Sequence, residues 1–164
     1  MLKRQFILYD LEATCWRSPK PRKVEIIEIG AVKVNENLEI IDEFCEFILP
    51  VLHPTIDKFC TKLTSITQED VDPADNFNIV VKRFEEWMKP NDMPTALLSW
   101  GEFDKRQFAA DARLHELELS WLKYWACLQR HYSKFKGSQN QIGLKNALKL
   151  EGLDFNGTQH RAIE

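Results

Sequence analysis

The sequence predicts an α/β fold in which one mixed β-sheet carries helices on both faces. Two short apolar runs, 6–9 and 95–100, have the continuous hydrophobicity of strands that are covered on both sides. Residues 24–34 and 39–49 are apolar segments joined by the polar turn 35–37, which is typical of an antiparallel hairpin. Apolar residues recur at helical spacing elsewhere in the chain and predict helices. We therefore expect a single domain in which these helices pack in layers against the sheet.

The strands end at polar turns, prolines or glycines, and they are expected at residues 5–10, 24–34, 39–49, 95–100 and 123–126. Gly30 lies inside the second strand, where glycine marks a bulge or the close approach of another backbone segment. The order of elements along the chain is strand, hairpin, helices, strand, helix and helices.

Helices are expected at residues 57–63 and 67–71, at 75–89, in a segment ending near 114, in a short segment before 135, and at 141–150. Thr67 is a plausible N-cap for the second of these helices, and Thr158 for a last helix at the end of the chain.

Composition limits the possible classes of function. The chain has 164 residues, 44% of them hydrophobic, which fits one globular domain with a substantial core. A net charge of −3 gives no support to a protein that wraps a nucleic-acid duplex. A protein that grips a single-stranded end remains compatible, because bound metal ions can supply positive charge locally.

The cysteines and the N-terminus predict a cytoplasmic location. The cysteines are too far apart in the sequence for a C-x-x-C motif and are expected to be buried free thiols. The apolar run behind the basic N-terminus is too short for a signal peptide, and no segment reaches the length of a membrane span.

Three acidic residues follow predicted strands. Asp10 and Glu12 are two positions apart, so strand alternation places both on one face, where they repel each other unless a cation lies between them. Taken alone, the pair fits a metal site and a solvated strand end equally well. Asp104 follows the strand at 95–100 and, without other context, would be interpreted as a helix N-cap. All three fall at carboxyl ends of strands, where such sheets bind ligands.

A basic cluster, Arg17, Lys20, Arg22 and Lys23, lies on the proline-containing loop after Glu12. A solvated loop is the commoner meaning of such a run. Its position next to the acidic pair also allows contact with an anionic substrate.

These motifs resemble the DEDDh (DnaQ-like) 3′–5′ exonucleases, which have a ribonuclease H-like fold. Residues 10–14 resemble the D-x-E-x-T motif, 99–104 the second motif, and 160–162 the start of the H-x-x-x-x-D motif. Segments 15–16 and 59–67 are similar to the ERI-1-like branch, which includes KapD-type proteins. The resemblance covers essentially the whole chain, 1–164, as a single exonuclease domain.

The resemblance implies a two-metal mechanism with Mg²⁺ or Mn²⁺. Asp10 would bridge both ions, Glu12 would bind the ion that carries the attacking water, and Asp104 would hold the second ion. His160 would accept the proton from that water as general base. Catalytic residues are therefore expected to be Asp10, Glu12, Asp104 and His160, the first three of them as metal ligands.

The resemblance also implies a substrate, the single-stranded 3′ end of RNA or DNA, with RNA favoured. Backbone groups of the first motif are expected at the 3′-hydroxyl, and an aromatic residue with the 63–66 segment at the terminal bases. These substrate-binding residues are Leu11, Ala13, Thr14, Trp16, Leu63, Thr64 and Ile66. Trp100 and Phe103 are expected to pack in the core rather than to stack on bases. No membrane is expected as a partner, and no protein partner is indicated.

One departure concerns the last acid of the family pattern, which belongs five residues after the histidine. Glu164 is one position early, and one position on a helix rotates a side chain by roughly 100°. We expect a sequence truncated just before this acid, whose parent continues with Asp and a final helix. The chain as given should then bind metal poorly and turn over slowly or not at all.

Two other functions stay open at this point. A nucleic-acid-binding module with the same fold but impaired catalysis is suggested by the absent last acid. A small-molecule phosphoesterase would act on nucleoside monoesters and would be indifferent to polymer length.

Overall fold

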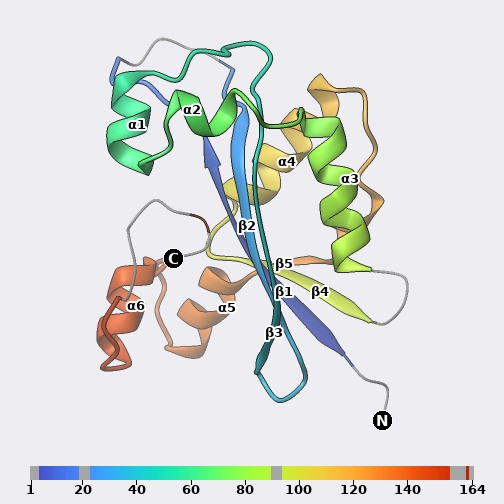
Figure 1. Ribbon diagram of the computed structural model, residues 1–164. Helices are drawn as coiled ribbons and strands as arrows, with labels where there is room; N and C mark the ends of the chain where they lie inside the picture. The colour runs from blue at the N-terminus through green and yellow to red at the C-terminus, as the bar shows by residue number, and fades with distance from the viewer. Residues whose placement is uncertain (1–3, 19–22, 90–93, 156–161, 163–164) are drawn as a thin grey trace.

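The computed structural model describes residues 4–18, 23–89, 94–155 and 162. Its centre is a five-stranded mixed sheet in the order β3-β2-β1-β4-β5 (Figure 1). The strands are β1 (Gln5–Ala13), β2 (Ile26–Val34), β3 (Ile40–Phe47), β4 (Thr95–Ser99) and β5 (Trp125–Cys127). The mixed sheet and the hairpin that were expected from the sequence are both confirmed.

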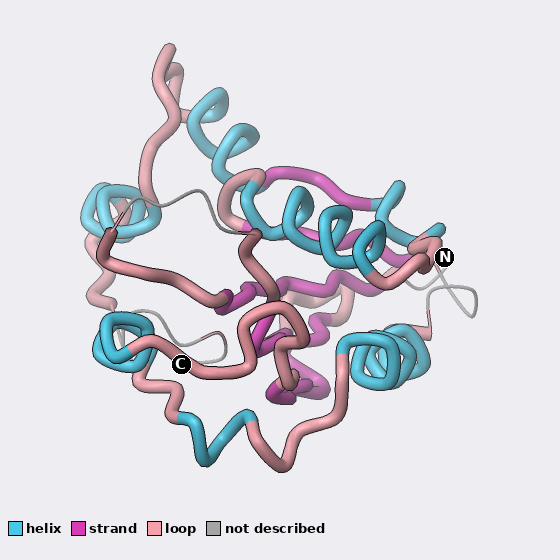
Figure 2. The backbone as a smooth tube through the Cα atoms, turned by 90° about the horizontal axis from the view of Figure 1, so that it is seen from above, coloured by secondary structure: helices cyan, strands magenta, loops and turns pink. Residues whose placement is uncertain are grey.

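The helices lie around this sheet, as the view from above shows (Figure 2). They are α1 (Lys58–Thr64), α2 (Gln68–Val71), α3 (Phe77–Met88), α4 (Phe103–Leu114), the 3-10 helix η1 (Ser120–Tyr124), α5 (Leu128–Phe135) and α6 (Leu144–Leu150). In Figure 1, α3 and α4 lie to one side of the strands and α5 and α6 to the other. The helix expected after Thr158 falls outside the described residues.

The register of β1 differs on its two sides. Antiparallel pairing with β2 runs from Phe6 to Ala13, whereas parallel pairing with β4 ends at Leu8. The strand therefore extends beyond the predicted 5–10, because β2 continues to hydrogen-bond to it. Asp10 and Glu12 lie inside β1 rather than beyond its end, but on the stretch that β4 no longer borders.

The main core lies between the sheet and α3, α4 and η1. Its largest fully buried side chains are Phe77 and Phe84 from α3, Phe108 from α4 and Trp121 from η1. Phe84 and Phe108 stack with their ring centroids 5.9 Å apart. Burial of each such side chain contributes roughly 1.5–3 kcal/mol, so this aromatic cluster fixes α4 against β1 and β2.

A second, smaller core packs α1 and α2 near the N-terminal end of β2. Ile27 of β2 packs with Cys60 of α1, Ile66 and Val71. In the described part of the chain, no helix has both the length and the apolar character needed to cross a bilayer.

Candidate active site

β1 presents the two acidic residues on one face. The only register shift along the β1–β2 ladder falls between Glu12 and Ala13, so alternation holds from Tyr9 to Glu12. Tyr9 and Leu11 point into the main core. Asp10 and Glu12 consequently project from the opposite face, as the sequence predicted.

β2 adds a third carboxylate to this face, which sequence reasoning missed. Glu28 lies directly opposite Glu12 in the ladder, and its side chain is fully buried. Its Oε1 accepts from the Cys45 thiol at 3.5 Å and its Oε2 from the Ala162 backbone N–H at 3.3 Å. The hairpin predicted from the sequence joins β2 to β3 and does not contain Glu12, so it gave no signal that Glu28 would face Glu12.

Asp104 reaches the site from the first turn of α4, immediately beyond β4. It is 4% exposed, and burial raises the pKa of its carboxyl to about 6, against hydrogen bonds from its own backbone N–H and that of Leu11. The contact with Leu11 places this carboxylate beside β1, next to Asp10. The packing of α4 thus joins an acid remote in sequence to the acidic face of β1.

Asp10 is the most perturbed carboxylate of the group. Although the residue faces solvent, surrounding protein atoms limit hydration of its carboxylate, which raises its pKa to about 7. The negative charges of Asp104 and then Glu28 raise this pKa further, and the Leu11 backbone N–H lowers it. Asp10 therefore lies within electrostatic reach of carboxylates from α4 and β2.

These side chains suit a hard divalent cation, because carboxylate oxygens are the ligands that such ions prefer. The carboxylates also bring several negative charges close together, which a cation would neutralise. Within the described ranges, no three His, Cys, Asp or Glu side chains are already arranged as a metal-binding group. The acidic residues match a divalent cation in ligand type and in charge. A bound cation would remove the repulsion from Asp104 and Glu28 that contributes to the raised pKa of Asp10.

Ala162, the described residue of the third motif, meets the same face. Ala162 lies against Gly30, which is opposite Asp10 in the β1–β2 ladder. Gly30 is thus a point of close backbone approach, one of the two roles expected for a glycine in this strand. The predicted base His160 lies outside the described residues.

The predicted substrate-binding residues separate into two groups by exposure. Leu11, Ala13 and Thr14 are buried, and the Thr14 hydroxyl accepts from the Glu25 backbone N–H at 3.0 Å. Trp16 is half-buried, with its ring 5.0 Å from that of His53. Leu63 is 38% exposed.

The expectations for Thr64 and Ile66 need correction, because both side chains are buried and do not face solvent. The Thr64 hydroxyl donates to the Cys60 carbonyl at 3.0 Å and accepts from the Ile66 N–H at 3.2 Å. Ile66 belongs to the second core. Both residues therefore shape the turn after α1 rather than offering a contact surface.

Phe103 also differs from expectation. It was expected in the core, but its side chain is 50% exposed, one residue before Asp104. Position N1 of α4 turns it outward while Asp104 turns inward. An exposed aromatic ring next to Asp104 in the sequence is a candidate base contact, the role that sequence reasoning ranked below core packing.

Comparisons with known proteins concern the family and the fold of this chain. The exonuclease (RNase_T) family model matches residues 7–164. Human 3′–5′ exoribonuclease 1 is 34% identical over 170 residues, which cover 96% of this chain and 48% of the human protein. The chain spans about a quarter to a half of the length of the curated relatives it matches.

Solved structures show the same arrangement of elements. The nuclease domain of 3′hExo, a DEDDh family member bound to rAMP, superposes with a TM-score of 0.89 at 32% identity, covering 95% of this chain and 82% of that one. A 3′-exonuclease in a structure of 3′-end-specific recognition of histone mRNA stem-loop gives a TM-score of 0.90 at 30% identity, with coverage of 97% and 58%.

Proposed function

Because this chain belongs to the exonuclease (RNase_T) family and has the DEDDh, ribonuclease H-like fold, we propose that it is a divalent-metal-dependent 3′–5′ exonuclease acting on single-stranded RNA ends. The observation that carries the proposal is the convergence of Asp10 and Glu12 on one face of β1 with Asp104 from α4. RNA is preferred over DNA because the matched proteins are named exoribonucleases.

The three carboxylates would hold two Mg²⁺ or Mn²⁺ ions. When bound, such ions supply an activated water and charge neutralisation for phosphodiester hydrolysis. Asp10 is the central ligand in this proposal, since it is exposed between Glu12, on its own strand, and Asp104. Burial of Glu12 and Asp104 limits the positions their carboxylates can adopt, which orients them before metal arrives.

His160 is the proposed general base. It lies two positions before Ala162, which contacts Gly30 beside Asp10, and two positions of chain span at most about 7 Å. His160→Ala should leave divalent metal binding intact while the hydrolysis rate falls. Loss of metal affinity in titration calorimetry of this variant would instead make His160 a ligand.

Phe103, Leu63 and Trp16 are the proposed contacts for the terminal nucleotides. Each offers apolar surface that is at least partly exposed, and a base can stack on an aromatic ring in either RNA or DNA. Phe103→Ala should weaken binding of a single strand by about 1–3 kcal/mol. Phe135→Ala is the matched control, since this ring on α5 is 82% exposed and remote from the acids in sequence.

The activity test uses a single-stranded RNA labelled at its 5′ end and incubated with Mg²⁺ or Mn²⁺. Stepwise shortening from the 3′ end, abolished by EDTA and by Asp10→Asn but not by the exposed Asp154→Asn, supports the nuclease. Binding without shortening, in a version extended to include the native C-terminus, would support the non-catalytic module. Hydrolysis of nucleoside monoesters without effect on polymers would support the phosphoesterase.

A further inference from the structure

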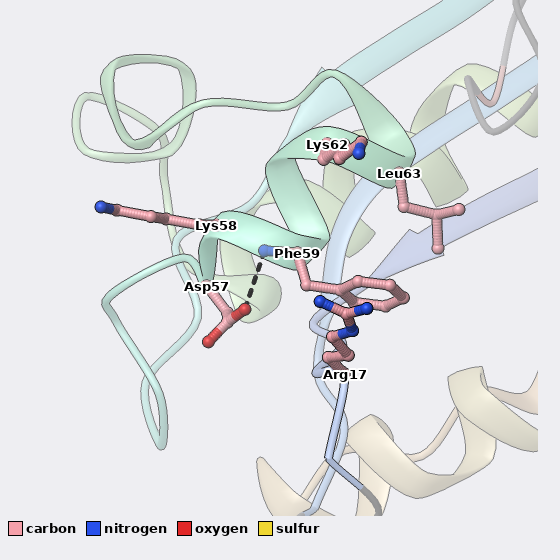
Figure 3. Close-up of a pocket in the computed structure, with 6 residues that line it drawn as sticks. All are labelled: Arg17, Asp57, Lys58, Phe59, Lys62 and Leu63. Atoms are coloured by element: carbon pink, nitrogen blue, oxygen red, sulfur yellow. Dashed lines mark hydrogen bonds between the residues drawn. The ribbon is translucent and has the colours of Figure 1, made fainter.

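The acidic cluster has different neighbours on its two sides. On the side of β2, the Cys60 thiol of α1 donates to the Ala13 carbonyl of β1 at 3.6 Å, and Leu63 of the same helix lines a cavity of about 560 Å³ (Figure 3). On the other side, the sheet continues from β1 through β4 to β5, where Trp125 is half-buried. The proposed nucleotide contacts all lie outside β5, so this second side calls for a separate explanation.

Residues 99–104 carry the chain from the end of β4 to Asp104 in the first turn of α4. Gly101 in this turn has a φ of +116°, a value that residues with a side chain rarely adopt. The Ser99 side chain is 2% exposed, and its hydroxyl donates to the Gly101 carbonyl at 3.0 Å. The turn ahead of Asp104 is therefore closed by a hydrogen bond from a buried side chain.

Trp125 contacts residues on both sides of Asp104. Its indole Nε1–H donates to the Ser99 hydroxyl at 2.9 Å. The Lys105 ammonium lies over its ring, 4.5 Å from the ring centroid, and a cation is attracted to the face of an indole. One side chain of β5 thus holds both the start of the turn and the residue that follows Asp104.

α5 adds a further contact to the same turn. The Arg130 guanidinium forms an ion pair with the carboxylate of Glu102, the N-cap residue of α4, and both side chains are partly exposed. Exposed ion pairs are weak in water. The half-buried contacts of Trp125 therefore carry more of the restraint on this turn.

The direction of the indole hydrogen bond determines what the Ser99 hydroxyl can do, because a hydroxyl has one proton and two acceptor positions. Its oxygen accepts from Trp125, so its proton is directed to the Gly101 carbonyl or to the Asp104 carboxylate. Burial raises the pKa of the Asp104 carboxyl to about 6, and hydrogen bonds from its own backbone N–H, the Leu11 N–H and the Ser99 hydroxyl oppose this shift. The indole therefore keeps Ser99 a donor toward the acid.

We propose that Trp125 is a positioning residue for the metal site, which acts through Ser99 and Lys105 to fix the Asp104 carboxylate where a divalent ion would bind. The proposal rests on the proposed function, because Asp104 has this task only if the acids hold metal ions. A ligand must be held within about 0.5 Å of its productive position, so a carboxylate next to a turn needs support from surrounding side chains. Loss of a supporting hydrogen bond commonly lowers metal affinity by roughly 10- to 100-fold.

Titration calorimetry with Mn²⁺ tests the proposal. Trp125→Phe keeps a ring beneath Lys105 but removes the indole N–H, and it should weaken Mn²⁺ binding by roughly tenfold. Ser99→Ala should have a similar effect, and the double variant should bind no more weakly than the weaker single variant, because all three lose the same hydrogen bond. Trp87→Phe is the matched control, since it removes an indole N–H on α3 that donates to Asp42 at 2.9 Å.

The rate of RNA shortening at rising Mn²⁺ concentration provides a second readout, which a misfolded variant would not reproduce. Trp125→Phe should be slow at limiting Mn²⁺ and should recover most of the wild-type rate at saturating Mn²⁺. Leu63→Ala, which changes a wall of the cavity in Figure 3, should instead weaken RNA binding in EDTA and leave Mn²⁺ affinity unchanged.

The outcomes separate this proposal from the proposed function. Wild-type Mn²⁺ affinity of Trp125→Phe, in a protein that shortens RNA normally, would overturn the role of Trp125 and leave the nuclease intact. Losses that multiply in the double variant would show that Trp125 does not act through Ser99. Where Trp125→Phe fails to fold, unchanged Mn²⁺ affinity of Ser99→Ala would overturn the proposal. A wild type that binds no Mn²⁺, even when extended to include the native C-terminus, would overturn the proposed function and this proposal with it.

Discussion

Gly30 and Ala162 are in such close contact that a methyl group on the Gly30 Cα would lie 2.4 Å from the Ala162 carbonyl carbon. Gly30 is opposite Asp10 in the ladder, and the Ala162 N–H donates to Glu28, which is opposite Glu12. Two contacts thus join Ala162 to the acid-bearing face of β1 and β2, and the hydrogen bond to Glu28 spans a sequence separation of 134 residues.

Gly30→Ala should reduce 3′–5′ exonuclease activity by at least tenfold while the domain remains folded. The new methyl group cannot be accommodated without moving backbone atoms at Ala162, which displaces the segment that contains His160. Activity and circular dichroism should be compared with those of Gly143→Ala, because a Cβ at Gly143 meets nothing within 4 Å. Equal activities of the two variants would contradict a role for this contact.

Mg²⁺ or Mn²⁺ should stabilise the protein against heat. The like charges of Asp104 and Glu28 contribute to the raised pKa of Asp10, and a bound cation relieves this repulsion. At about ten times Kd the gain is about 1.4 kcal/mol, or roughly 3–6 °C in Tm. Differential scanning fluorimetry should show the shift in the wild type, its reversal by EDTA, and its absence in Asp10→Asn. A full shift in that variant would locate the ion elsewhere.

Glu25→Gln should lower the free energy of unfolding by about 1–3 kcal/mol. The Glu25 carboxylate is 2% exposed and accepts backbone N–H groups of Val51, Leu52 and His53 at 2.7–3.0 Å. An amide retains one oxygen and turns an NH₂ group toward these donors. Urea unfolding is the measurement, with the exposed Glu43→Gln on β3 as control. Similar midpoints for both variants would refute the assigned role.

Asp111→Asn should remove a pH dependence of stability. Burial raises the pKa of Asp111 to about 6, although the Ile26 N–H and Gln107 amide hydrogen bonds oppose the shift. The folded protein therefore binds this proton more tightly than the unfolded chain does. The resulting stabilisation is fully present below about pH 4 and is lost as pH rises through about 6, by up to about 3 kcal/mol.

The comparison of wild type and Asp111→Asn by urea unfolding at several pH values tests this sign. The asparagine variant loses an acceptor oxygen and should be less stable throughout, but its deficit should shrink as pH rises from 4 to 6. A deficit that grows over this range would show that the carboxylate is favoured in its charged form.

The sequence was sufficient for features that depend on neighbouring residues. Strand alternation places Asp10 and Glu12 on one face whatever the rest of the chain does, and the apolar run before them requires a covered strand. The extension of β1 to Ala13 was not predictable in this way. It depends on hydrogen bonds supplied by β2, which continue after β4 has ended.

By itself, then, the sequence determined the mixed sheet, the hairpin and the pair of acids, because period-two alternation and turn chemistry are local properties. Only the tertiary structure decided that Asp104 lies beside Leu11, that Glu28 faces Glu12, that Phe103 is exposed while Ile66 is buried, and that Ala162 contacts Gly30. These relationships depend on strand register and on how helices pack across many tens of residues, and no local pattern encodes either one.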